Sequence, residues 1–182
     1  PIKAIGLSGA MHTLAPLDTA GRPLARAMTW ADRRAADVAD RMVAQCDADA
    51  MYQRTGCPLS VLYHPPRLAW WAKRGMRPER WAAIKDIILH QLTGRWVTEW
   101  SMASATGLLD IHQQRWDEQA LKIAHVDADQ LPRPVRPASI VGQVTAGAAQ
   151  ATGLPVGLPV IAGASDGRSE ERRVGKECAT GC

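Results

Sequence analysis

The stretch PVIAGASDG, residues 159–167, gives the strongest indication of the fold. Its first half is apolar and has the length of a buried β-strand, and it opens into small residues around Asp166. A carboxylate at the end of such a strand, between Gly163 and Gly167, is expected to be poorly solvated and reachable by a ligand. It can serve as a general base toward a hydroxyl or hold Mg²⁺. An Asp-Gly turn without any chemistry explains the same residues.

A charged block, RSEERRVGKEC at 168–178, follows this stretch without a spacer. It has no apolar face at helical spacing. One choice of codons for the block reproduces a common sequencing-library adapter. We therefore interpret 168–182 as a non-native tail produced by read-through into the adapter, and a genuine solvated tail is the alternative.

Composition restricts the class of protein. The chain has 182 residues, 46% hydrophobic and 22% charged, as expected for one globular domain with a core. The net charge of +4 comes from scattered basic residues among few aromatics, so we expect no nucleic-acid partner. Neither a membrane span nor a signal peptide is recognisable. The four cysteines lack zinc or redox spacing, which favours reduced thiols and a cytoplasmic location.

Secondary-structure signals alternate along the chain, which indicates an α/β or α+β class. The first part predicts a strand at 2–7, a hairpin at 14–24 and a helix that begins with Thr29 and Asp32 as a variant capping box. Further helices are expected at 65–73, 78–81, 84–92, 117–124 and 146–151, the last capped by Thr145 and ended by Gly153. Strands are expected at 96–99, 108–111, 140–142 and 158–162, with a Pro-rich extended connector at 131–138.

Two further groups of residues are candidates for binding. Met11 and His12 directly follow the first strand, where a ligand is commonly contacted, although a histidine bonded to backbone is the alternative. Trp30 and Asp32 can form a polyol pocket at a helix start, although capping alone explains Asp32. Either Arg33 or Arg34 is expected to face an anionic substrate, and spacing does not decide which. Phosphate-loop, metal-cluster and nucleophile-elbow motifs are absent, which disfavours hydrolase and metalloenzyme chemistry.

Four segments in this order resemble the sugar kinases of the FGGY family. They are IGLSGAMHTLAPLDTAGRPLARAMTWADRR at 5–34, TGCPLSVLYHPPRLAWW at 55–71, IKDIILHQLTGRWVTEWSMASATGLLDIHQQRWDEQAL at 84–121 and GLPVGLPVIAGASDG at 153–167. Within the family, the details are most similar to gluconokinases, whereas glycerol kinases would show Arg-Glu where Met11-His12 stand. The resemblance implies a ribonuclease-H-like, actin-like ATPase fold of class α/β. Residues 1–167 would then be an incomplete N-terminal domain without its first strand and phosphate loop.

The same resemblance implies the chemistry. Asp166 would be the catalytic base and would bind the metal, while Met11, His12, Trp30, Asp32 and Arg34 would line the sugar site. The cofactors would be ATP and Mg²⁺, and the reaction would convert D-gluconate to 6-phosphogluconate. A xylulokinase-like or other polyol kinase, or a non-catalytic sugar-binding fragment, remains as the alternative. We expect the chain alone to be inactive, the partners to be small molecules and not membranes, and a homo-oligomer to be compatible with this reading.

Overall fold

The computed structural model describes residues 2–169 of the chain, so the segment 170–182, most of the expected non-native tail, lies outside the described residues. The centre is a three-stranded sheet in the order β1 (Ile5–Gly9), β9 (Pro159–Ser165) and β8 (Ile140–Gln143). β1 and β9 run parallel, and β8 is antiparallel to β9. The described residues also form three two-stranded pairs: β2 (Ala15–Leu17) with β3 (Arg80–Ala82), β4 (Val97–Glu99) with β7 (Arg133–Val135), and β5 (Leu109–Asp110) with β6 (Arg115–Trp116).

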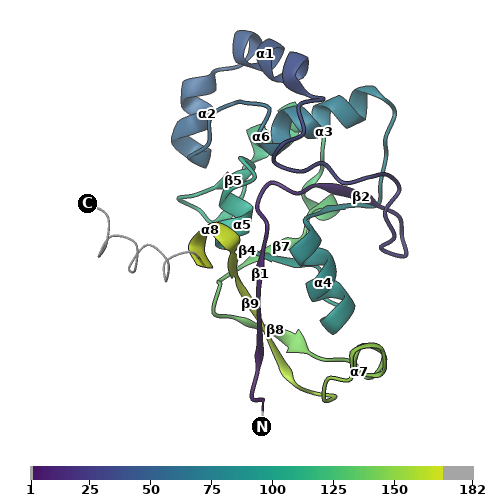
Figure 1. The fold of residues 1–182 in the computed structure, drawn as a ribbon. Coiled ribbons are helices and arrows are strands. Elements are labelled where there is room, and N and C mark those ends of the chain that lie inside the picture. Colours follow the sequence, from purple (N-terminus) through teal and green to yellow (C-terminus); the bar gives the residue numbers. More distant parts are fainter. Residues whose placement is uncertain (1, 170–182) are drawn as a thin grey trace, which may run out of the picture.

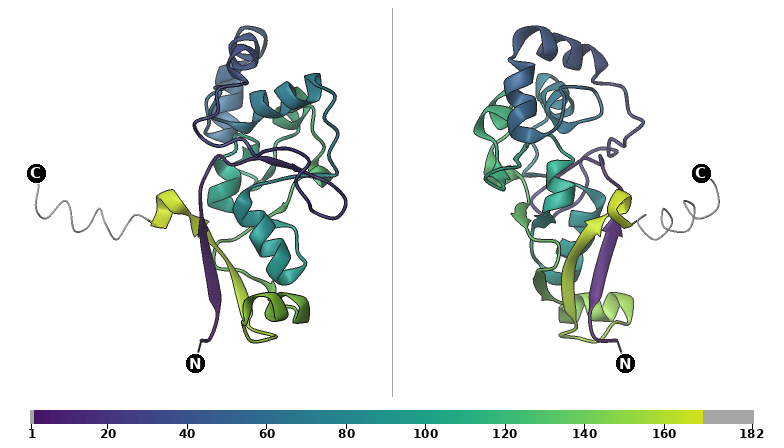
Figure 2. Two further views of the ribbon diagram at one scale, coloured as in Figure 1. Left: turned by 45° about the vertical axis from the view of Figure 1, so that its right-hand side comes forward. Right: turned by 90° about the vertical axis from the view of Figure 1, so that its left-hand side faces the viewer.

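The helices gather at two ends of the molecule (Figure 1). One end holds α1 (Ala36–Gln45), α2 (Ala48–Thr55), α3 (His64–Lys73) and α6 (Glu118–Ala124). At the other end, α4 (Ile84–Thr93) and α7 (Ala146–Thr152) lie beside the three-stranded sheet. The short helices α5 (Trp100–Ser104) and α8 (Asp166–Ser169) lie between the ends, where β1 and β9 terminate (Figure 2). A 3₁₀ turn covers Ala128–Gln130. This arrangement is the mixed α/β class expected from the sequence.

Two apolar clusters form most of the core. The larger one joins α1, α3 and α6, and its most buried members include Leu68, Leu108 and Ala120. The second lies between α4, α7 and the sheet, and Leu89 and Val160 are fully buried there. Burial of each large apolar side chain contributes about 1.5–3 kcal/mol. The clusters therefore give the two ends separate apolar cores.

Local signals fix several helix ends. Thr145 caps α7 by accepting a hydrogen bond from the amide of Ala148, and Gly153 ends the helix in the left-handed conformation, as predicted. Residues Ala120, Leu121 and Ala124 of α6 are buried, which confirms the inward face expected at 117–124. Pro65 and Pro66 occupy the first turn of α3, where a missing amide costs little.

Gly163 lets β1 and β9 approach closely. Its φ is +77°, and a Cβ at this position would lie 1.9 Å from the carbonyl oxygen of Leu7. The pairing of β1 with β9 is irregular between Gly6 and Ser8, beside this contact. A side chain at 163 would therefore push the two strands apart, and with them the segments that follow each strand.

The expected capping box at Thr29 and Asp32 is wrong. Helix α1 begins only at Ala36, and Ala31, expected on its buried face, is exposed. The carboxylate of Asp32 instead accepts hydrogen bonds from the amide and guanidinium of Arg34. Side-chain bonds of this local kind compete with helix formation.

Other differences come from strand pairing over long sequence distances. The segment 78–81, expected to be helical, enters β3, which pairs with β2. The hairpin expected at 14–24 forms in a short version, in which Leu17 bridges Pro23 in antiparallel register and the amide of Leu24 donates to the carbonyl of Pro16. The Pro-rich segment 131–138 contains β7, which runs parallel to β4. Each partner strand lies far away in the sequence, so local patterns give no sign of it.

Candidate functional site

Asp166 and Met11 meet where β1 and β9 end. The strands are parallel and Gly9 pairs with Ser165, so the segments that follow the two strands leave the sheet at the same edge. The amide of Met11 donates to Oδ1 of Asp166 at 3.2 Å across 155 positions of sequence. The same oxygen accepts from the amide of Gly167 at 2.9 Å. Asp166 is exposed, so its expected poor solvation is wrong: the residue begins α8 at the open end of the sheet.

An open cavity of about 570 Å³ adjoins this contact. Its wall includes Met11 and His12, which follow β1, and Ser165 and Gly167, which flank Asp166 in the sequence. The remaining wall comes from the end of α2 and the loop after it, from α5 and its C-cap, and from the residue after β5: Thr55, Gly56, Cys57, Tyr63, Ser101, Ser104, Ala105 and Ile111. The volume lies within the range of small-molecule sites. We call this space the strand-end cavity.

At His12 the backbone turns, and the residue lines the strand-end cavity. Its φ of +59° is left-handed, which is uncommon for a residue other than glycine. Its ring meets Tyr63 edge-on, with 5.5 Å between ring centroids. Burial, assisted by the positive charge of Arg67, lowers the pKa of His12 below its ordinary value. The imidazole is therefore neutral at pH near 7 and can exchange hydrogen bonds with a hydroxyl.

The guanidinium of Arg67, on α3, joins three segments of the chain. The side chain is fully buried. It donates to the carbonyls of Val61 at 2.9 Å, His12 at 2.7 Å and Thr29 at 2.9 Å. Burial lowers the pKa of Arg67, an effect opposed by Asp32. Sequence reasoning missed this residue, and its one signal is a charged side chain inside the apolar helix PPRLAWW.

Trp30, Asp32 and Arg34 lie apart from the strand-end cavity, whose wall contains none of them. Arg34 donates to Oδ2 of Asp32 from Nη2 at 2.6 Å and from Nε at 2.9 Å. Hydrogen bonding from Arg34 holds the pKa of Asp32 below its ordinary value. The guanidinium also lies 5.2 Å from the ring centroid of Trp70. Trp30 is 70% exposed. The structure thus brings Asp166 to Met11, places Met11 and His12 in the cavity wall, and leaves the other three predicted residues away from this contact.

A buried ion pair supports the other wall of the strand-end cavity. Nζ of Lys85 donates to Oε1 of Glu99 at 3.2 Å and to the carbonyl of Ala164 at 2.9 Å. The two charged side chains are 1% and 0% exposed. Glu99 also accepts from the amide and hydroxyl of Ser101, and that hydroxyl accepts from the amide of Ser165 at 3.1 Å. The network thus ends one residue before Asp166, and sequence reasoning missed it.

Two buried titratable groups lie behind His12. His64 and Asp86 line an enclosed space of about 20 Å³, which also touches His12. Burial raises the pKa of Asp86 to about 7 and lowers the pKa of His64 to about 3. His64 is therefore uncharged near neutral pH, whereas Asp86 is divided between its protonated and ionised forms.

A cation at the strand-end cavity would find few protein ligands. Residues 2–169 contain no group of three or more His, Cys, Asp or Glu side chains placed to hold a metal ion. Asp166 is the carboxylate at this edge, so Mg²⁺ would take its other oxygens from water or phosphate. Across the described chain, helices are too short or too polar to span a membrane.

Comparisons with known proteins agree with this arrangement. The profile of the FGGY family of carbohydrate kinases, N-terminal domain, matches residues 1–170. The gluconokinase of Bacillus subtilis is 31% identical over 170 residues, which cover 91% of this chain and 33% of that protein. The xylulose kinase of Streptomyces coelicolor is 33% identical, with 90% and 34% covered. The crystal structure of gluconate kinase from Lactobacillus acidophilus superposes with a TM-score of 0.85 at 29% identity, with 92% and 35% covered.

The chain belongs to the FGGY family of carbohydrate kinases, and its fold is that of the family's N-terminal domain. This confirms the family and fold inferred from the four sequence segments. The chain spans about a third of the length of these relatives.

Proposed function

We propose that the protein carrying this chain is an ATP-dependent carbohydrate kinase that phosphorylates D-gluconate to 6-phosphogluconate. The observation that carries the proposal is the contact between the amide of Met11 and the carboxylate of Asp166 beside the strand-end cavity. It joins a binding segment and an acidic group from opposite ends of the chain. A sugar in the cavity would lie against the binding segment and against Ser165 and Gly167, the two neighbours of Asp166.

Asp166 would act as the general base. Two backbone amides occupy its Oδ1 and orient the carboxylate. Oδ2 accepts no hydrogen bond from the described residues, which leaves it available for the proton of a substrate hydroxyl. The hydroxyl oxygen would attack the γ-phosphorus of ATP as the proton passes to Oδ2, and ADP would leave. Mg²⁺ would neutralise the phosphates.

His12 and Tyr63 would orient the sugar. The neutral imidazole can accept or donate a hydrogen bond, and Tyr63 fixes the ring from its edge. Trp30 and the Asp32–Arg34 pair would meet the sugar only from outside the present cavity wall. Arg33 and Arg34 are both exposed, and Arg34 is already bound by Asp32, so a substrate carboxylate would have to compete for it. The assignment of gluconate as the substrate therefore rests on the family likeness more than on an arginine side chain directed at a substrate carboxylate.

A related pentulose or polyol kinase is the second candidate. The likeness to the xylulose kinase of Streptomyces coelicolor, equal in extent to the gluconokinase likeness, favours it. We also propose that residues 1–167 form an incomplete N-terminal domain and that the 182-residue chain alone binds sugar without turning over ATP. The whole enzyme would act in the cytoplasm.

The test is a coupled ADP-release assay on the full-length protein with ATP and gluconate, xylulose or glycerol. We expect gluconate to give the highest kcat/KM, and turnover of xylulose without gluconate would reject this assignment. Asp166→Asn should lower kcat by about 10³-fold or more while calorimetry still detects sugar binding. Asp40→Asn, an exposed aspartate on α1, is the matched control and should leave kcat unchanged. Activity retained by the Asp166 variant would exclude its role as base.

A further inference from the structure

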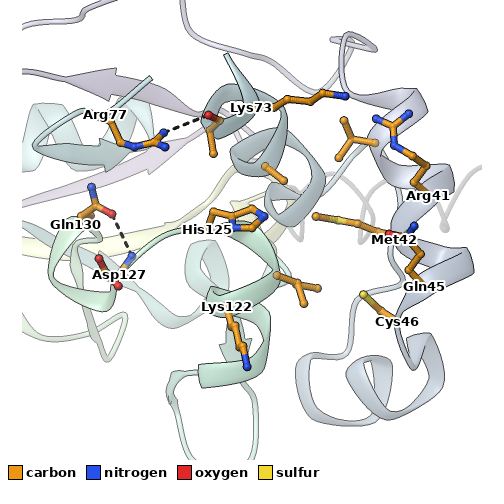
Figure 3. A pocket seen from close by; sticks show the side chains of 14 residues that line it. Arg41, Met42, Gln45, Cys46, Lys73, Arg77, Lys122, His125, Asp127 and Gln130 are labelled. Carbon is orange, nitrogen blue, oxygen red and sulfur yellow. Dashed lines mark hydrogen bonds between the residues drawn. The ribbon is translucent and has the colours of Figure 1, made fainter. Parts of the chain in front are cut away.

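A second and larger cavity lies between α1, α3 and α6. Its volume is about 860 Å³, and its wall shares no residue with the strand-end cavity. Figure 3 shows it from close by, with α1 on one side and α6 below. We call it the three-helix pocket. Nothing in the proposed phosphoryl transfer uses it.

The floor of the three-helix pocket is apolar. Each helix contributes to it: Val38 and Met42 from α1, Ala69 and Ala72 from α3, and Ile123 from α6. Val38 and Met42 are each 8% exposed and belong to the larger core cluster. The side chain of Met42 points into the open space (Figure 3). A ligand would therefore bury apolar surface directly against the core, at about 25 cal/mol per Å².

The rim of the three-helix pocket is cationic. Arg41, Lys73, Arg77 and Lys122 all line it, against a single acidic residue, Asp127. Within the described chain, the ammonium groups of Lys73 and Lys122 form neither a hydrogen bond nor an ion pair. The two lysines come from different helices, α3 and α6. Asp37, which lies outside the pocket wall, interacts electrostatically with Lys73 without forming an ion pair, so the rim keeps four basic side chains against two nearby carboxylates.

The two arginines are partly engaged. Arg41 pairs with Asp37 at 3.0 Å, and both side chains are largely exposed. Nη1 of Arg77 donates to the carbonyls of Ala72 and Met76. Exposed ion pairs of this kind are worth little, so a better anion can replace them. Arg77 keeps further donors on its guanidinium for a ligand.

Solvated lysines and arginines are ordinary on helix surfaces, but here they surround an apolar hollow. A simple inorganic anion would satisfy the rim and leave the floor unused, and a neutral apolar molecule would do the reverse. From this combination we propose that the three-helix pocket binds a small amphipathic anion, an organic phosphate with an aromatic or aliphatic body. The phosphate would contact Lys73 and Lys122, and the body would cover Met42 and Ile123.

The test uses 1-naphthyl phosphate as the probe and neutral 1-naphthol as its matched partner, titrated into the full-length protein by calorimetry with saturating gluconate present. We expect the phosphate to bind with one site per chain and to weaken as salt is added. Lys73→Gln with Lys122→Gln should weaken the phosphate about tenfold or more and leave 1-naphthol unchanged. Ala72→Trp, which fills the floor at a half-buried position, should weaken both probes.

The control pair Lys3→Gln with Arg95→Gln removes the same charge at exposed positions outside the pocket and should keep the affinity. Equal losses in the control and pocket variants would overturn the proposal, because general attraction by net charge would then explain binding. Unchanged affinity in the lysine variant would also overturn it. Sedimentation provides a third way to overturn it. If the parent protein is an oligomer that does not bind the probe and the pocket variants are monomers, the pocket is an interface between copies of the chain. Activity with gluconate is a separate readout, so failure of either proposal leaves the other tested independently.

Discussion

Two buried cations lie beneath the strand-end cavity, and they are stabilised in opposite ways. Arg67 donates to four main-chain carbonyls in three segments, and no carboxylate accepts a hydrogen bond from it among the described residues. Lys85 donates to the carboxylate of Glu99 and to one carbonyl. The first region therefore compensates a charge with backbone dipoles, and the second with a counter-ion.

The difference shows which residue makes most of the hydrogen bonds in each region, and we call this residue the hub. In the first region the cation is the hub, because its planar fork reaches carbonyls from three separate segments. In the second region the anion is the hub, since Glu99 also accepts from Ser101 and from the amide of Met102 at 3.0 Å. Removing the hub should cost more than removing its partner, and the following substitutions test this ranking.

Arg67→Met should have the largest effect. It leaves the carbonyls of Val61, His12 and Thr29 without their donor inside the protein, and we expect the free energy of unfolding to fall by about 4 kcal/mol. Arg67→Lys should recover part of the loss, because one ammonium cannot reach all of these carbonyls. Urea denaturation followed by circular dichroism measures both. A loss below about 1 kcal/mol for the methionine variant would contradict the assignment of Arg67 as hub.

Glu99→Gln should rank second. It leaves the ammonium of Lys85 buried without a counter-charge, and we expect a loss of about 3 kcal/mol. Lys85→Met should cost about half as much, because Glu99 keeps its three donors from Ser101 and Met102. The two denaturation curves are compared under one buffer condition. A larger loss for the lysine variant would reverse the assignment of the hub.

Asp86→Asn should reveal a pH-dependent effect of about 2 kcal/mol. The pKa of Asp86 is raised to about 7 in the folded chain, so folding binds a proton that the unfolded chain releases above its ordinary pKa of 3.8. Stability from this group therefore falls as pH rises through that window. His64, with its pKa lowered to about 3, acts in the opposite direction, so the variant must be compared with the parent at each pH.

Between about pH 5 and about pH 7, the Asp86 variant should gain about 2 kcal/mol of stability relative to the parent chain. Asp49→Asn, at an exposed position on α2, should show no such gain and serves as the control. Parallel pH dependence of the Asp86 variant and the parent would show that the carboxyl is ionised in the fold.

Trp30→Ala should have the smallest effect on stability. The side chain is 70% exposed, so the free energy of unfolding should change by about 0.5 kcal/mol or less. If Trp30 packs on the sugar as predicted, the affinity for gluconate should fall several-fold in calorimetry on the full-length protein. Unchanged affinity would remove Trp30 from the sugar site. The substitution leaves the hydrogen bond from Arg67 to the carbonyl of Thr29 in place. The variant therefore tests the side-chain contact of Trp30 with the sugar without disturbing the backbone of the turn.

Local signals in the sequence predicted the parts of the fold that depend on neighbours. The cap at Thr145, the buried face of α6 and the strand that ends at Asp166 all follow from spacing and composition, and the structure confirms them. The predicted helix start at Thr29 was wrong because the carboxylate of Asp32 accepts hydrogen bonds from Arg34 and does not cap a helix.

Long-range partners could not be predicted from the sequence. Arg67 and Lys85 are charged residues on helices, and a periodicity argument places such residues in solvent. Their burial depends on Val61, Thr29 and Ala164, which reach them only after the chain has folded. For the site, the sequence predicted Met11, His12 and Asp166 as neighbours through family likeness. The separation of Trp30 and the pairing of Arg34 needed coordinates.

The clamp made by Arg67 has a consequence for how substrate preference can change. Its acceptors are main-chain carbonyls, which every amino acid provides, so side chains at positions 11, 12, 29 and 30 can be exchanged without removing a partner of the guanidinium. A turn held by its backbone keeps its shape while its surface chemistry drifts. Related proteins can therefore change the sugar hydroxyls that they recognise while this backbone conformation is kept. Libraries randomised at these four positions should retain a high fraction of folded members.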